Sequence, residues 1–546
     1  MSLGMSGAAP LAGMPQGLAQ VMNLGNLLTQ TARKFPGHPG FIQGEYTLSW
    51  SQINARVDAL AHHFAALGVR PGDRILVQLV NGLPLFESAW LAFKLGAVWV
   101  PVNYRLTPAE VAYIAQSSGA SLMLTQHAFD AHAAAAQAES PALKQLIRVD
   151  DPAYEEMAAS QPGVPAFVAA EVSAPHPLWF FFTSGTTGRP KAAVLTHGQM
   201  AFVINNHLAD LLPGLREDDA SLVVAPLSHG AGIHALVNVA RGAASILLRG
   251  ESLDCVAAFE AIEKHRVSNI FTVPTILKRL AEDPAAARFD HSSLKRVIYA
   301  GAPMYQADQR RALDVLGPVI VQYFGLGEVT GNITVLQPDE HLEGGGALLG
   351  SCGTARCGME VAVLDEACQP VAAGVQGEIC TRGQAVFAGY WNNPEANALA
   401  FRGGWFHTGD LGLMDERGFV TITGRSSDMY ISGGSNVYPR EIEEAILTMP
   451  EIAEAVVFGV PDAQWGETGV AVLAPRVPGA SLAAGDVLAH LQPRLARYKW
   501  PRNIEFWPAL PKSAYGKLVK KDIRAEYLRR HEAPADLPEA PAVQKP

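Results

Sequence analysis

The segment Leu178-Trp179-Phe180-Phe181-Phe182-Thr183-Ser184-Gly185-Thr186-Thr187-Gly188-Arg189-Pro190-Lys191 joins an apolar run to a loop of hydroxyl residues, glycines and cations. The apolar run, residues 178–182, is short and aromatic, which predicts a buried strand. In the loop, glycines let main-chain N–H groups approach oxygens closely, hydroxyls donate further hydrogen bonds, and two cations neutralise charge. The segment therefore predicts a strand followed by a phosphate-binding loop. On composition alone, a flexible hairpin loop is an equal alternative.

This loop differs from the Walker A phosphate loop. The Gly-x-x-x-x-Gly-Lys-[Ser/Thr] spacing is absent, and residues 192–196 after the loop are typical of a second strand rather than a helix. The loop is thus expected to connect two strands.

The bulk composition indicates a large enzyme-like protein. A chain of 546 residues is long enough for several cores, and a cleft between domains fits that size. A formal charge of -10 gives no electrostatic reason to expect nucleic acid as a partner. The cysteines are few, odd in number and without a Cys-x-x-Cys pair, which favours a reducing cytoplasm: Cys255, Cys352, Cys357, Cys368 and Cys380.

No transmembrane segment is predicted, because Lys94 and Arg241 interrupt the two richest apolar stretches. Residues 1–20 are expected to be a tag-like start and a disordered tail, without the features of a signal peptide, and residues 531–546 a second disordered tail. The body of the protein lies between them.

Alternating helical and strand-like segments predict an α/β fold with a large N-terminal domain at residues 21–425. Two α/β subdomains are expected to divide near residue 170. From about 353 to 423, short strands between Gly-rich turns predict a β subdomain. A small α+β domain, residues 426–530, is expected to follow, with helices at 439–447 and 483–495.

Two further motifs combine aromatic, glycine and acidic residues. Gln322-Tyr323-Phe324-Gly325-Leu326-Gly327-Glu328 offers an aromatic face for a purine and a carboxylate for a hard cation. Trp405-Phe406-His407-Thr408-Gly409-Asp410 ends in an aspartate, a hydrogen-bond acceptor with two oxygens. Taken singly, each motif is also explained by an ordinary turn or strand end.

Together with the loop at 183–191, these motifs resemble the adenylate-forming superfamily, in its acyl-CoA synthetase branch. They follow in the family's order over roughly residues 25–525. The resemblance implies an α/β N-terminal domain, made of two α/β subdomains and a β subdomain, with a small mobile α+β C-terminal domain. It also implies ATP, Mg²⁺ and coenzyme A.

The resemblance assigns roles to individual positions. Catalytic roles fall to Lys517, Glu328 and Lys191, with Glu328 holding Mg²⁺. The expected cofactor-binding residues are Thr183, Ser184, Gly185, Thr186, Thr187, Gly188, Gly301, Ala302, Pro303, Tyr323, Phe324, Asp410, Arg425, Gly433, Gly434 and Trp465. In particular, Phe324 stacks on adenine, Asp410 and Arg425 contact ribose, and Trp465 with the two last glycines lines the pantetheine tunnel. Taken alone, Arg425 and Lys517 are equally typical of the protein surface, and Trp465 of a hydrophobic core.

Three positions depart from the family pattern. Phe324 takes a position that is usually tyrosine, and Gly327 replaces a threonine, which removes a hydroxyl near the phosphates. Ser427 stands where an aspartate or lysine usually forms the hinge of the small domain. Because Gly327 lacks a hydroxyl, the hydroxyls of the loop at 183–187 are expected to make more of the phosphate contacts.

The implied activity is that of an AMP-forming carboxylic acid:CoA ligase. The candidate acid-pocket residues are mainly small or apolar and include no Arg or Lys to pair a second carboxylate: His229, Gly230, Val273, Pro274, Leu277, Gly301, Gly325, Leu326, Gly327 and Val329. A medium- or long-chain fatty acid or an aromatic monocarboxylic acid is therefore expected. His229 is equally well explained as a satisfied histidine at a strand end.

Two alternatives to a stand-alone acyl-CoA synthetase stay open. One is an adenylating enzyme that loads a carrier protein. The other, suggested by Gly327 and Ser427, is a catalytically impaired nucleotide-binding sensor. The partners expected are the acid, ATP and CoA, and the sequence leaves open whether the protein is a homodimer.

Overall fold

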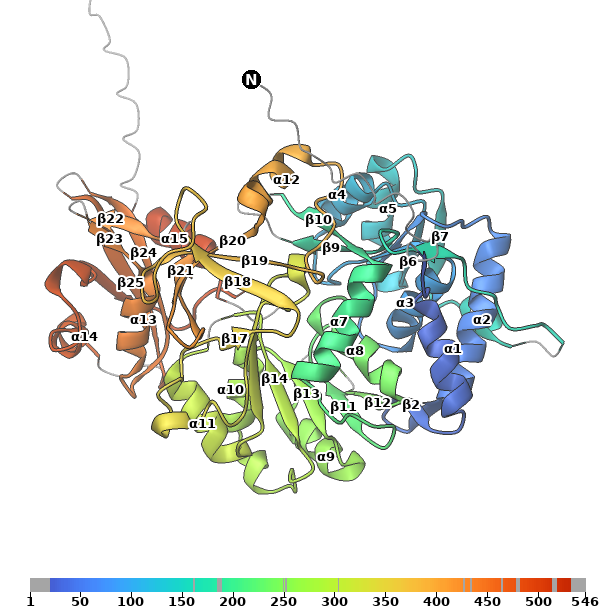
Figure 1. Cartoon of the computed structure of the whole chain (residues 1–546), viewed down its shortest axis with the longest axis horizontal. Coiled ribbons are helices and arrows are strands. Elements are labelled where there is room, and N and C mark those ends of the chain that lie inside the picture. The colour runs from blue at the N-terminus through green and yellow to red at the C-terminus, as the bar shows by residue number, and fades with distance from the viewer. Residues whose placement is uncertain are drawn as a thin grey trace, which may run out of the picture. The chain divides into compact units, whose positions relative to one another are not determined.

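The computed structural model describes residues 20–160, 163–183, 189–248, 250, 253–302, 304–425, 428–432, 435–462, 465–477, 482–512 and 518–531. The chain folds as two compact units, Met1–Ile422 and Thr423–Pro546 (Figure 1). The predicted tails at 1–20 and 531–546 lie outside the described residues apart from Gln20 and His531. Among the described residues, no helix has the length and apolar character needed to cross a bilayer.

The N-terminal unit contains a six-stranded sheet built around parallel strands. Its order is β10 (Lys191–Thr196), β9 (Pro177–Thr183), β5 (Val98–Pro101), β4 (Arg74–Val77), β6 (Leu122–Thr125) and β7 (Gln145–Arg148). Only the edge strand β10 runs antiparallel to its neighbour β9. The two strands that flank the phosphate-binding loop therefore form a hairpin at one edge of the sheet.

A nine-stranded sheet forms the second α/β layer. Its order is β17 (Thr354–Ala355), β16 (Thr334–Leu336), β15 (Ile320–Phe324), β14 (Arg296–Tyr299), β13 (Asn269–Thr272), β11 (Ala220–Val223), β12 (Ala244–Leu247), β2 (Pro39–Gln43) and β3 (Tyr46–Ser49). The predicted division near residue 170 is wrong, because β2 and β3 join this second sheet while β9 and β10 complete the first. Which sheet a strand joins depends on pairing with strands far away in the sequence, and the local hydrophobic pattern carries no information about that pairing.

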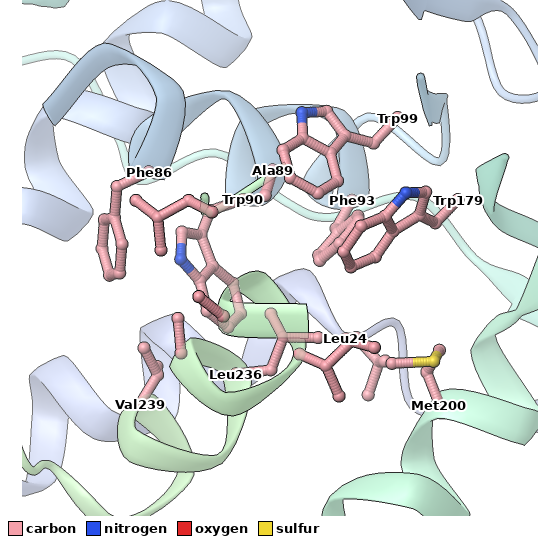
Figure 2. Close-up of a cluster of buried hydrophobic side chains, with 14 of the residues drawn as sticks. Leu24, Phe86, Ala89, Trp90, Phe93, Trp99, Trp179, Met200, Leu236 and Val239 are labelled. Atoms are coloured by element: carbon pink, nitrogen blue, oxygen red, sulfur yellow. The ribbon is translucent and has the colours of Figure 1, made fainter. Parts of the chain in front are cut away.

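Helices lie between the two sheets and outside both of them. One core joins the facing sides of the sheets through α1 (Gly25–Lys34), α2 (Trp50–Ala66), α3 (Leu83–Lys94), α7 (His197–Asp210) and α8 (Gly230–Arg241). Figure 2 shows part of this core, where Trp90 and Phe93 of α3 lie near Trp99, Trp179 and Leu236.

The outer faces of the sheets have their own cores. Helices α4 (Pro108–Ser118) and α5 (Asp130–Glu139) cover the six-stranded sheet, and α9 (Cys255–His265), α10 (Pro274–Glu282) and α11 (Gln306–Leu316) cover the other. The result is a layered α/β arrangement, which confirms the predicted fold class.

A four-stranded antiparallel sheet follows, as the Gly-rich turns predict. It is formed by β18 (Met359–Leu364), β19 (Gly377–Gly383), β20 (Phe406–Met414) and β21 (Val420–Arg425). Helix α6 (Pro152–Ala158), helix α12 (Pro394–Ala400) and the short pair β1 (Gln20–Val21) and β8 (Val172–Ser173) complete the regular elements of this unit apart from short 3₁₀ turns.

The C-terminal unit is a five-stranded sheet with helices on both faces. Its order is β23 (Ser435–Val437), β22 (Tyr430–Ser432), β25 (Gly466–Pro475) and β24 (Ile452–Asp462), with β26 (Asn503–Phe506) also paired to β25. Helices α13 (Pro439–Leu447) and α14 (Ala484–Leu491) pack on one face and α15 (Lys520–His531) on the other. The predicted α+β composition is confirmed, although the helix expected at 483–495 ends earlier, before Pro493, which disfavours helix in the residue that precedes it.

Lys94, which interrupts the apolar pattern of α3, is paired inside the protein. Its side chain is fully buried and forms a salt bridge with Asp58 of α2, and its Nζ donates to Asn54 Oδ1 at 2.8 Å. Burial lowers the pKa of Lys94, and the Asp58 carboxylate opposes that shift. The ammonium therefore depends on Asp58 for its place in the core.

Replacing Asp58 with alanine is expected to destabilise the N-terminal unit strongly. Removing one partner of a buried pair leaves an uncompensated charge, which costs roughly 3–5 kcal/mol. Urea titration followed by tryptophan fluorescence measures the loss. The control, Glu360→Ala, breaks a pair with Arg382 in which both side chains are more than half exposed, and should cause a much smaller change. Equal shifts for the two variants would contradict this account.

Candidate active site

The phosphate-binding loop begins and ends on two paired strand residues. Thr183, the last residue of β9, pairs with Lys191, the first residue of β10. Between them, Ser184, Gly185, Thr186, Thr187 and Gly188 lie outside the described residues. The hairpin thus fixes both ends of the loop on the edge of the six-stranded sheet.

Glu328 is held by two hydroxyl groups from distant parts of the chain. It lies in the turn Gly327–Val329 after β15 and is only 5% exposed. Its Oε1 accepts hydrogen bonds from Thr183 Oγ1 at 2.8 Å and from the Tyr390 hydroxyl at 3.0 Å. Burial and the negative charge of Glu328 raise the pKa of Tyr390, so the phenol stays a donor at neutral pH.

A positive charge lies over the ring of Tyr390, one of the two donors to this carboxylate. Lys191 Nζ is 5.2 Å from the centre of the Tyr390 ring, over its face. A fixed carboxylate with hydroxyls and an ammonium nearby suits Mg²⁺ and phosphate oxygens, because Mg²⁺ prefers a hard oxygen ligand and takes its other ligands from phosphates and water. The donor set therefore fits the predicted cation.

Phe181 explains the glycine at position 327. A Cβ added to Gly327 would lie 2.6 Å from Phe181 Cδ1 and 2.9 Å from Thr183 Cγ2. The Phe181 ring also meets the His229 ring edge-on, with 5.2 Å between ring centres. His229 Nδ1 in turn lies 3.1 Å from Ser228 Oγ. An aromatic ring thus occupies the space of the missing side chain and reaches the predicted acid pocket.

A group of stacked rings lies beneath Gly230. The missing Cβ of Gly230 faces Phe271, whose ring would be 2.7 Å away. Phe271 stacks nearly parallel to His234 and to Tyr323, with ring centres 4.3 and 6.0 Å apart. Tyr323, which precedes Phe324, is buried. The three rings close the space behind Gly230.

The remaining predicted residues of the nucleotide motif lie at strand ends of the nine-stranded sheet. Phe324 is partly exposed at the end of β15, and a Cβ on Gly325 would lie 2.4 Å from Gly331 Cα, so only glycine fits there. Leu326 is partly buried. After β14 and β13 come Gly301, Ala302 and Val273, while Pro303 lies outside the described residues. The structure therefore brings the described motif positions of the second sheet to its carboxyl end.

Asp410 of β20 is positioned by a network that sequence reasoning missed. It is 5% exposed, and its N–H donates to Thr408 Oγ1 at 3.1 Å. The preceding N–H, of Gly409, donates to Glu378 Oε1 at 2.9 Å. Glu378 Oε2 lies 2.8 Å from His407 Nδ1 and accepts from Arg402 at 2.5 Å. The main chain on both sides of Asp410 is thus fixed.

In the C-terminal unit, fewer predicted positions are described. Arg425 is exposed at the end of β21. Trp465 is 43% exposed, and Arg502 lies 5.9 Å from the centre of its ring. Lys517, Ser427, Gly433 and Gly434 lie outside the described residues.

The N-terminal unit also contains a cavity of about 610 Å³ that none of the predicted site residues line. One lining residue, Asn81, donates to the Ala225 carbonyl at 3.0 Å and accepts from Leu227 N–H at 2.9 Å. Asn81 therefore fixes the segment that leads to His229, although no motif marked it.

Comparisons with known proteins agree along most of the chain. Residues 28–391 match the AMP-binding enzyme family, and residues 441–517 match the AMP-binding enzyme C-terminal domain. A feruloyl-CoA synthase from Amycolatopsis is 35% identical over 510 residues, which cover 92% of this chain and 99% of that protein. An indoleacetate–CoA ligase from Aromatoleum aromaticum is 32% identical, with 93% and 99% covered.

A solved structure is similar in fold as well. The ATP-bound MatB from Rhodopseudomonas palustris superposes with a TM-score of 0.84 at 28% identity, covering 93% of this chain and all of that one. Two family models thus match the chain, and its relatives align along nearly their full length. The chain therefore belongs to the AMP-binding, adenylate-forming enzyme family, in its acyl-CoA synthetase branch.

Proposed function

We propose that this protein activates a compact, ring-containing monocarboxylic acid with ATP and transfers the acyl group to coenzyme A. The observation that carries the nucleotide chemistry is the convergence of Thr183 and Tyr390 on the Glu328 carboxylate, with Lys191 over the Tyr390 ring. This arrangement offers a cation-binding oxygen and an ammonium where a triphosphate needs both.

In the first half-reaction, the acid carboxylate attacks the α-phosphate of ATP, and acyl-adenylate and pyrophosphate form. Glu328 would hold Mg²⁺, which supplies charge neutralisation at the phosphates when bound. Thr183 and Tyr390 orient Glu328, Lys191 and the loop hydroxyls bind phosphate oxygens, and Asp410 with Arg425 binds the ribose. Phe324 offers its ring to the adenine.

In the second half-reaction, the CoA thiol attacks the acyl carbon and AMP leaves. Lys517 serves the first step, where negative charge is crowded at the carboxylate and the α-phosphate. Gly433, Gly434 and Trp465 serve the second, because glycines permit close approach of the slender pantetheine chain. A turn about Ser427 exchanges these groups, so that one active site performs both steps.

The preference for a ring-containing acid follows from the aromatic surroundings of the predicted pocket. Phe181 lies between Gly327 and His229, and the stacked rings of Phe271, His234 and Tyr323 close the space behind Gly230. A flat ring fits against aromatic faces, whereas an extended fatty tail needs an open channel.

A panel of acids tests the proposed function. With Mg²⁺ and ATP, ring-containing monocarboxylic acids should release pyrophosphate and, once CoA is added, form thioesters faster than long-chain fatty acids or dicarboxylates do. Release of pyrophosphate without thioester formation would favour a carrier protein as acceptor. The enzyme proposal fails if no acid releases pyrophosphate with or without CoA.

Replacing Lys517 with alanine is expected to separate the half-reactions. Adenylate formation should fall by roughly two orders of magnitude or more, because an ammonium aimed at developing charge is lost. Thioester formation from supplied acyl-adenylate should stay close to the wild-type rate. Single-turnover assays of each step measure this, and equal losses in both would refute the division of labour.

Restoring the family threonine at position 327 is expected to damage this enzyme. In Gly327→Thr the new Cβ collides with Phe181, so kcat/KM for the acid should fall by about 5- to 150-fold, as overpacking costs roughly 1–3 kcal/mol. Adding Phe181→Ala should recover part of that loss. If the double variant is as impaired as the two single losses multiplied together, Phe181 is not the residue that requires the glycine.

A further inference from the structure

The cavity of about 610 Å³ lies at the carboxyl ends of parallel strands of the six-stranded sheet. Residues 79–84 after β4, Gln126 after β6 and Val149 after β7 line it. The β2–β3 hairpin of the other sheet adds Gln43 and Tyr46. Tyr46 is 48% exposed, so solvent reaches the cavity. Its volume is that of a site for a small molecule.

The topology of the sheet also favours a ligand at this place. Helix α3, which follows β4, packs in the core between the two sheets, whereas α5, which follows β6, covers the outer face. Strands β4 and β6 are neighbours, so the chain leaves them toward opposite faces of the sheet. Open α/β sheets bind ligands in the crevice that such a divergence creates outside the carboxyl ends of the strands. The phosphate-binding loop, by contrast, lies at the edge of the sheet, between β9 and β10.

The charges around the cavity favour an uncharged ligand. Glu155 of α6 is the one charged side chain among the described residues that line it. Arg56 donates to the two carboxylate oxygens of Glu155 at 2.7 and 3.0 Å, and it forms a second salt bridge with the buried Glu87. A cationic ligand would therefore meet a carboxylate that is already paired. An anionic ligand would find no lysine or arginine among these lining residues.

Three polar side chains of the lining offer hydrogen-bonding groups to a ligand. Gln126 Oε1 accepts from the Val80 N–H at 3.0 Å, which holds the amide in place and leaves its Nε2 as a donor. The side chains of Gln43 and Tyr46 make no hydrogen bond to a described residue. Two amide N–H₂ groups and a phenol supply more donors than acceptors. A carbonyl oxygen is the uncharged ligand group that matches them.

Leu79, Leu83 and Val149 add apolar surface to the same cavity. All three are buried and belong to the core between the sheets. Apolar side chains with a small number of polar groups are the usual lining of a small-molecule site. A ligand that combines an apolar body with a carbonyl group satisfies both parts of the lining.

We propose that this cavity is a second ligand site, separate from the active site, and that it binds an uncharged carbonyl compound such as an amide of a ring. Gln126, Gln43 and Tyr46 bind the carbonyl, and the buried apolar side chains contact the ring. Asn81 also lines the cavity, but its amide is already bonded to the Ala225 carbonyl and the Leu227 N–H. It contributes no further group to the ligand.

Fluorine NMR with three compounds that share a ring and differ in charge tests this site. The full-length protein is titrated with para-fluorobenzamide, para-fluorobenzylammonium and para-fluorobenzenesulfonate. The amide should bind with a dissociation constant on the order of millimolar, as expected for a fragment of its size, and the two ions at least about tenfold more weakly. An excess of AMP and benzoate should not displace the amide. Displacement would place the probe in the active site and overturn the proposal, as would equal binding of an ion or no binding of the amide.

Two variants locate the bound amide. Gln126→Glu keeps the oxygen that accepts from Val80 N–H and removes the amide donor, so affinity should fall at least about tenfold. Val80→Trp fills the cavity from a partly exposed position and should abolish binding. Thermal melting checks that both variants fold.

Gln145→Glu is the matched control. It makes the same exchange at the first residue of β7, at the opposite end of the sheet, where Gln145 Nε2 donates to the Leu67 carbonyl at 2.9 Å. This variant should bind the amide as wild type does. Equal affinities of Gln126→Glu and Gln145→Glu would overturn the proposal. Because no turnover is measured, the result is independent of the ligase reaction.

Discussion

The hydrogen bonds that converge on Glu328 link the edge of the six-stranded sheet to the turn that follows β15 of the nine-stranded sheet. Thr183 belongs to the six-stranded sheet, Glu328 follows β15 of the nine-stranded sheet, and Tyr390 comes from the segment between β19 and α12. The main chain around Tyr390 pairs with β10, so both donors belong to the edge of the six-stranded sheet. Burial strengthens each bond and makes each lost partner expensive. The nucleotide site is consequently a product of the assembled fold rather than of the loop alone.

Strand β9 shows how the fold delivers these groups. Side chains alternate along a strand, so Trp179, Phe181 and Thr183 share one face. Trp179 packs in the core between the sheets, and Phe181 packs against the same core, whereas Phe180 belongs to the core on the outer face. A single strand thus contributes a core residue, a ring that lies against His229 and Gly327, and a hydroxyl that donates to Glu328. The helices between the sheets set the distance across which these side chains reach their partners.

Sequence reasoning predicted what local pattern encodes and missed what distant pairing creates. Apolar pattern and the glycines and prolines that bound it predict the strands on either side of the loop and the helix α13. The motifs identify Thr183 and Glu328, each on its own. Their direct bond was not predicted, because 145 residues separate them. Tyr390, Phe271 and His234 carry no motif, and only packing gives them a role. The misplaced division near residue 170 has the same origin, since β2 crosses to a sheet formed mostly by later residues.

The glycine at 327 shows why a departure from a family pattern needs the structure to be interpreted. From the sequence, it is a lost hydroxyl near the phosphates. In the fold, it is the space that Phe181 fills, and Phe181 lies two residues before Thr183 on the same strand face. Phe181 and Thr183 are thus joined by a short stretch of β9 that is paired with β10. Strand β9 thus carries both Phe181, which fills the space beside Gly327, and Thr183, which donates to Glu328.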